Sequence, residues 1–263
     1  MQPYEQNQYT YGSAFAPSQV QVDQGLRAFM LGVYNNMILG LAISGLVALG
    51  TNMLAIASSP ASAVARVGSN IYLTQFGALL YTSPLKWVIM LAPLAFIFLF
   101  SMRMDRMSAA SARGMFFAFA AVMGLSLSTI FLVFKLGSIV QVFFVTAAAF
   151  GALSLYGYTT KRSLSGMGSF LIMGAFGLML ASIVNIFLAS SALQFAISCI
   201  GVVIFAGLTA YDTQKLKEMY VYELGTPNGE VAAKASIFGA LTLYLDFINM
   251  FQFLLSLMGS RNE

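Results

Sequence analysis

The last long apolar stretch of the chain, residues 234–258, reads KASIFGALTLYLDFINMFQFLLSLM and decides the fold. It is longer than the roughly 20 residues that an α-helix needs to cross about 30 Å of hydrocarbon. After Lys234 its single charged residue is Asp246, near the middle. An Asp at the centre of a span costs roughly 2.5–3.5 kcal/mol on insertion scales. We therefore expect a membrane helix whose acid faces the interior of a helix bundle.

The preceding apolar stretch, residues 193–216, reads LQFAISCIGVVIFAGLTAYDTQKL and carries a second acid, Asp212, close to Lys215. At a rise of 1.5 Å per residue, Asp212 is expected roughly 5–8 Å inside its boundary and Asp246 about 18 Å from Lys234. Straight helices would therefore keep the two acids apart. Each acid would then interact separately with a helix end or a basic residue. If helix tilt closed the gap, two carboxyl groups in a low dielectric would share a proton.

Polar residues line one face of each of these two stretches. Thr242, Asp246 and Asn249 follow the i, i+4, i+7 spacing of a helix face, and Thr209 shares a face with Asp212. Such a stripe cannot face lipid. We expect the last helix to be central and to line a polar cavity.

The whole composition indicates an integral membrane protein. Of 263 residues, 59% are hydrophobic and 8% are charged, against roughly 25% charged in soluble domains. Residues 1–25 are rich in Gln, Tyr, Ser and Pro and are predicted to be a disordered cytoplasmic tail. Residues 26–263 are predicted to form an all-α domain of seven transmembrane helices. The expected spans are 28–54, 85–104, 114–134, 138–159, 167–189, 193–216 and 234–258.

Two further features of the chain bear on helix packing. Segment 71–81 is apolar but too short to cross, so we expect it at the interface, with a re-entrant segment as the alternative. Small residues at helix-contact spacing, such as Gly40 with Ser44 and Ala147 with Gly151, predict close approach between helices.

The basic residues set the expected orientation. Nine of the thirteen lie on the side that carries Arg27, which puts the N-terminus in the cytoplasm. This topology accounts for the net charge of +4, and no nucleic-acid partner is expected.

Several classes of protein are disfavoured. The chain has no His and a single Cys, Cys199, so we expect no zinc or haem centre, no intramolecular disulfide and no cofactor. Without a His base or a nucleophile motif an enzyme is not expected. Buried acids would also suit a proton-coupled transporter, but the two halves show no matching pair of broken helices.

Three motifs resemble the Bax inhibitor-1 family, the transmembrane Bax inhibitor motif proteins, in its bacterial form. They are AGLTAYDTQ at 206–214, LYLDFINMF at 243–251 and GALSLYGYTTK at 151–161. The resemblance implies a last helix surrounded by the other six, and a pH-sensitive calcium leak through the bacterial plasma (inner) membrane. It implies that Asp212 and Asp246 are the pH sensor and a weak calcium site.

The resemblance also implies an arginine latch near the end of the second span, where either Arg103 or Arg106 matches. No acid lies within this span, which has Ala92 and Pro93 instead. The leading hypothesis is thus a calcium leak channel gated by protonation of the aspartate pair. The alternative is a membrane interaction protein that modulates a membrane-bound protease or cell-survival partners without conducting ions.

Overall fold

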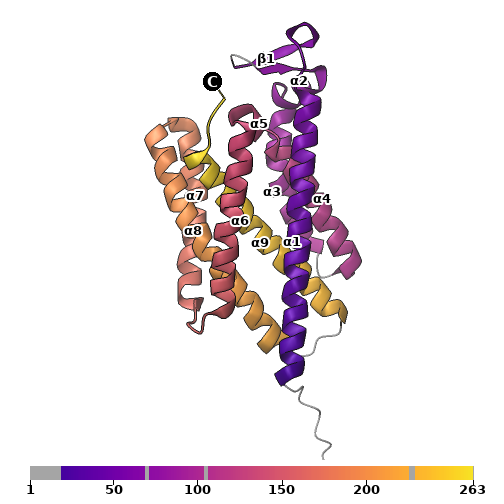
Figure 1. Ribbon diagram of the computed structural model, residues 1–263, viewed down its shortest axis with the longest axis vertical. Helices are drawn as coiled ribbons and strands as arrows, with labels where there is room; N and C mark the ends of the chain where they lie inside the picture. Colours follow the sequence, from indigo (N-terminus) through magenta and orange to yellow (C-terminus); the bar gives the residue numbers. More distant parts are fainter. Residues whose placement is uncertain (1–18, 69–70, 104–105, 225–228, 263) are drawn as a thin grey trace, which may run out of the picture.

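The protein is a bundle of long α-helices, as the hydropathy predicts (Figure 1). The computed structural model describes residues 19–68, 71–103, 106–224 and 229–262. The long helices are α1 (Gln19–Ala55), α3 (Leu85–Arg103), α4 (Ala109–Leu127), α6 (Leu136–Thr159), α7 (Ser165–Leu188), α8 (Ser191–Glu218) and α9 (Gly229–Met258). Among the described residues, six helical stretches are long and apolar enough to span a membrane, or seven if α3 and the short helix before it count as one bent span. The all-α membrane fold is confirmed.

Helix α1 starts at Gln19, inside the expected tail; residues 1–18 of that tail lie outside the described residues. Its first turns are held by tertiary contacts that the sequence pattern does not reveal. The ring of Phe29 packs 5.2 Å from the ring of Tyr220, centroid to centroid. Tyr220 belongs to η3 (Met219–Leu224), a π-helical continuation of α8.

The connection between α1 and α3 contains more secondary structure than the sequence indicated. Strands β1 (Ala65–Val67) and β2 (Ile71–Leu73) form an antiparallel hairpin, and helix α2 (Gln75–Tyr81) follows. A 3-10 turn, η1 (Pro60–Ser62), precedes the hairpin. Helices α2 and α3 meet at 62°. Residues 71–73 of the expected segment form a strand that pairs with β1, and the position of the segment at the interface stays a prediction.

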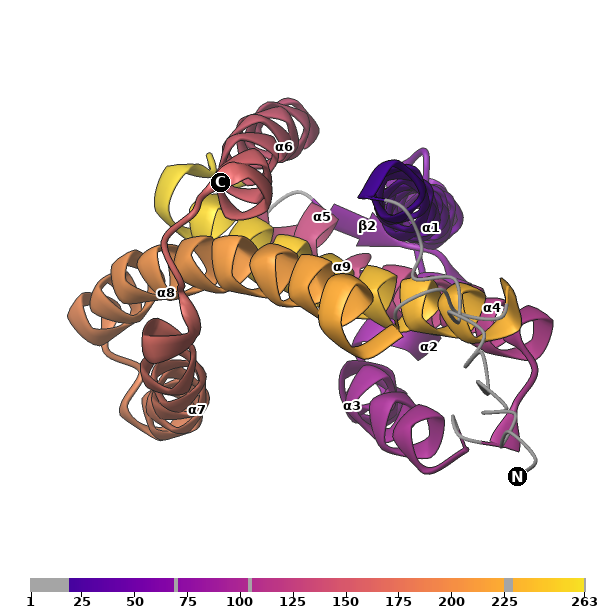
Figure 2. The same cartoon turned by 90° about the horizontal axis from the view of Figure 1, so that it is seen from below.

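Helix α9 is the centre of the bundle, as expected (Figure 2). It packs against α1, α4, α6 and α8. In the apolar 18-residue stretch of α9, 56% of the residues are buried inside the protein, against 17–33% in the corresponding stretches of the other spans. It is not ringed by all six other helices, however. Helix α3 packs mainly on α4, and α7 packs on α8, so both form an outer layer.

Small residues allow the inner helices to approach closely. A side chain added at Gly40 would meet the Phe116 ring at 2.7 Å, so the expected close packing there is confirmed. The Ser44 hydroxyl donates to the Ala120 carbonyl at 2.7 Å and lies 2.7 Å from the Tyr244 hydroxyl, joining α1, α4 and α9. Gly151, by contrast, has open space at its Cβ position, so the expectation of close packing there was wrong.

A short helix, α5 (Ile130–Val133), continues α4 after a break at Ser128. The two together form one candidate span, 109–133, close to the expected 114–134.

Candidate cation site: a buried aspartate pair

Helices α8 and α9 carry the two acids and lie side by side across the bundle (Figure 1). Their carboxyl groups come within hydrogen-bond reach of each other. The axial gap expected for straight helices closes because η3 prolongs α8 beyond Glu218, so Asp212 lies farther from the end of its helix than expected. The oblique course of α9 brings Asp246 to the same level.

The pair is sheltered from the surroundings. Asp246 is 5% exposed, and Asp212 is partly buried. One carboxylate oxygen of Asp246, Oδ2, has no hydrogen-bond partner among the described residues. Two carboxyl groups in such contact are joined by a shared proton, and they lose and gain protons as a unit. This arrangement can hold a proton or coordinate a cation through oxygen.

The charged group acting on Asp212 is the ammonium of Lys215, in the next turn of α8. That ammonium also lies 6.0 Å from the centre of the Tyr211 ring. The structure does not bring a latch arginine to the pair. Arg103 and Arg106 are both exposed, at the end of α3 and just beyond it, and α3 packs on α4 and α2 rather than on α8.

The stripe residues that flank the acids bond to their own helices. The hydroxyl of Thr209, fully buried, donates to Phe205 O at 2.8 Å. Thr242 and Asn249 donate likewise to carbonyls four residues earlier, at 3.2 and 2.8 Å. These bonds therefore satisfy their donors within the helix, and no side-chain hydrogen bond joins them to the acids among the described residues.

A second polar cluster lies farther along the same α8–α9 contact. The hydroxyl of Ser198 donates to that of Ser256 at 3.0 Å, and Gln194 contacts both. Between this cluster and the acids the contact is aromatic: the rings of Phe205 and Phe253 lie 5.8 Å apart. A side chain added at Gly201 would meet the Phe253 ring at 2.6 Å, so this ring lies directly on the α8 backbone.

Residues next to Asp212 tie α8 to its neighbours in ways that sequence reasoning missed. Thr213 Oγ1 lies 2.9 Å from Ser154 Oγ, which lies 2.6 Å from the Tyr34 hydroxyl, so a hydrogen-bonded chain joins α8, α6 and α1.

The amide side chain of Gln214 clamps the loop between α6 and α7. Its Nε2 donates to Arg162 O at 2.8 Å, and its Oε1 accepts from Leu164 N at 2.7 Å. The sequence signal for this clamp was a polar residue two positions after an acid in an apolar stretch.

As a metal site the pair offers few ligands. Two carboxylates supply four oxygens, whereas Ca²⁺ takes 6–8. Within the described part of the chain no group of three His, Cys, Asp or Glu residues comes together. Water would have to complete the coordination of any cation held here.

Fold and site together define an all-α integral membrane protein whose central, C-terminal helix carries a buried acid pair. A family model described as "Inhibitor of apoptosis-promoting Bax1" matches residues 26–263. The chain belongs to the Bax inhibitor-1 family.

Bacterial relatives cover nearly the full length. An uncharacterized protein of Caulobacter vibrioides is 46% identical over 93% of this chain and 93% of its own. An uncharacterized protein of Rickettsia prowazekii is 44% identical over 92% and 93%. The inner membrane protein YbhL of Escherichia coli is 42% identical over 92% and 95%.

Proposed function

We propose that the protein is a pH-sensitive calcium leak channel of the bacterial inner membrane, without catalytic activity. The observation that supports it best is the Asp212–Asp246 pair, buried on the central helix with one carboxylate oxygen unpartnered. Intramembrane acids mark ion or proton pathways. Few protein ligands make for weak binding, which conduction requires, because an ion must also leave.

The conduction path that we propose runs along the α8–α9 contact. It leads from the basic end, near Lys215, past the acid pair to the Ser198–Ser256 cluster. The stacked rings of Phe205 and Phe253 interrupt it. Hydrophobic constrictions of this kind close a pore by excluding water. This conformation is therefore a closed one, and opening requires α8 and α9 to separate at Gly201.

The latch and the orientation belong to the same proposal. Arg103 or Arg106 pairs with Asp212 in another conformation, which α3 can reach because it packs mainly on α4 and α2 at the edge of the bundle. The N-terminus lies in the cytoplasm, so that the basic ends of α1 and α8 are cytoplasmic. The inner membrane is proposed because the relative from Escherichia coli is described as an inner membrane protein.

The decisive test is calcium flux into liposomes that contain only this protein. We expect Asp246→Asn, nearly isosteric but unable to ionise, to abolish the pH dependence of flux while the protein still inserts. Asp23→Asn, at an exposed acid near the start of α1, is the matched control and should keep the wild-type curve. An unchanged flux curve for Asp246→Asn would refute the sensor. No flux from the wild-type protein would favour the alternative, a membrane interaction protein that regulates a membrane-bound protease or cell-survival partners.

A further inference from the structure

A groove runs between α1 and α6 on the side of the bundle. Helix α1 packs on α4 and α9, and α6 packs on α8 and α9, so the two face each other across α9 with little direct contact (Figure 2). The hydrogen bond between Tyr34 and Ser154 is one of the few links across this seam. The seam opens toward the lipid.

The half of the groove near the start of α1 holds a cavity of about 700 Å³. It extends from Arg27 to Ile38 on α1 and from Tyr158 to Phe150 on α6. Eleven residues of helix span about 17 Å, roughly half of the 30 Å hydrocarbon core, which is the depth of one leaflet. The cavity is open at its inner end, because Gly151 has no side chain and nothing lies within 4 Å of its Cβ position.

The cavity is positively charged at one end, and the polar residues that line its middle, Tyr34 and Ser154, are bonded to each other. Arg27 lines its mouth and is exposed, and Tyr158 lies opposite. The ammonium of Lys217 adds a second positive charge there, since it donates to Tyr158 O at 2.9 Å and lies 5.4 Å from the ring centre. The acids described at this end of the bundle, Asp23, Glu218 and Glu230, do not line the cavity.

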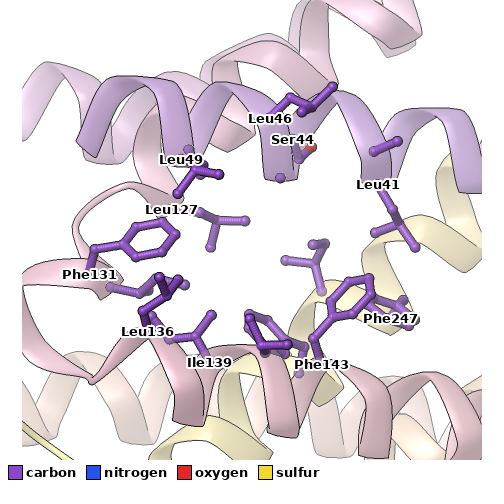
Figure 3. A pocket seen from close by; sticks show the side chains of 17 residues that line it. Leu41, Ser44, Leu46, Leu49, Leu127, Phe131, Leu136, Ile139, Phe143 and Phe247 are labelled. Carbon is purple, nitrogen blue, oxygen red and sulfur yellow. The ribbon is translucent and has the colours of Figure 1, made fainter. Parts of the chain in front are cut away.

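The other half of the seam between α1 and α6 holds a second cavity, which is almost entirely apolar (Figure 3). Its cavity of about 480 Å³ is lined by Leu, Ile, Val, Ala, Gly and Phe, and its one polar lining residue is Ser44. The hydroxyl of Ser44 is already bonded to Ala120 O and Tyr244. Among the residues that line the two cavities, an anionic headgroup therefore finds a positively charged partner only at the Arg27 end.

We propose that this groove is a binding site for one anionic phospholipid of the leaflet at the α1 N-terminal side. Its phosphate binds the Arg27 guanidinium beside Lys217, and one acyl chain lies along Ile38 and Gly151. Arginine recognises phosphate by paired N–H donors, and basic pockets between membrane helices bind anionic headgroups. This site does not depend on whether the protein conducts calcium.

Native mass spectrometry of the purified full-length protein tests the site, with dioleoylphosphatidylglycerol or dioleoylphosphatidylcholine added to the micelles. We expect one tightly held phosphatidylglycerol, bound about fivefold more tightly than phosphatidylcholine, the factor expected for one basic residue meeting an anionic headgroup. Arg27→Gln should remove this preference. Arg113→Gln, at an exposed arginine of α4, is the matched control and should retain it.

A second pair of variants tests the acyl-chain part of the groove. Gly151→Leu fills the cavity and should lose both lipids. Gly177→Leu, at a glycine of α7 that also has open space, should lose neither. Equal binding of the two lipids by the wild-type protein, equal losses in the two arginine variants, or equal binding by the two leucine variants would each overturn the proposal.

Discussion

Gly157 of α6 lies directly against the backbone of α8, and we expect Gly157→Ala to force these helices apart. A Cβ atom at this position would lie 2.9 Å from the carbonyl carbon of Ala210 and 3.0 Å from its Cα. Both are backbone atoms of α8, so no side chain can rotate away. Ordinary van der Waals contact begins near 3.4 Å. The helices must therefore separate by about half an ångström or more.

The expected cost is about 1–3 kcal/mol of unfolding free energy, the usual penalty for overpacking. Gly151→Ala is the matched control, because it lies on the same helix and its Cβ position is open. Reversible unfolding in mixed micelles with increasing sodium dodecyl sulfate measures both variants. The difference between them isolates the contact, since the change in helix propensity is common to both.

The result that would refute this reasoning is equal stability of the two variants. The α6–α8 contact would then be loose enough to absorb a methyl group. In that case Ala210, two residues before Asp212, would not fix the position of the acid.

Three further predictions address the path, the packing and the latch. Phe253→Ala should raise the calcium flux of proteoliposomes, because it removes the aromatic barrier; an unchanged flux would move the gate elsewhere. Tyr244→Phe should lower the unfolding free energy by only about 0.6 kcal/mol in the same micelle titration, a typical value for one hydrogen bond in a membrane. The loss is small because the Ser44 hydroxyl still donates to Ala120 O. A loss of several kcal/mol would contradict this. Either Arg103→Ala or Arg106→Ala, but not both equally, should raise resting flux without adding to the effect of Asp212→Asn; simple additivity of both arginine changes would exclude a latch.

The sequence predicted the spans well because hydropathy is a local property. Stretches such as 193–216 and 234–258 are too apolar and too long to be anything but membrane-spanning helices, and both are helical in the structure. It failed for the ends of helices, where tertiary contacts decide. Helix α1 extends into the expected tail, where Gly25 lies against the hydroxyl of Tyr220, and residues 71–73 form a strand by pairing with β1.

The packing glycines show the same limit. Gly40 and Gly151 have similar neighbours in the sequence, yet the first lies against Phe116 and the second lines an open groove. Spacing identifies which residues are small but not which helix lies opposite. The groove between α1 and α6 therefore had no sequence signal beyond Arg27.

By itself, the sequence determined that the chain crosses a membrane as helices and that Asp212 and Asp246 must avoid lipid, because an acid in hydrocarbon is too costly to face outward. Only the tertiary structure decided that the two acids meet. More than thirty residues separate them, and their contact requires α8 to continue through η3 and α9 to cross the bundle obliquely. It also decided that Arg103 and Arg106 lie away from the pair in this conformation, since the course of α3 is set by packing on α4 rather than by its own sequence.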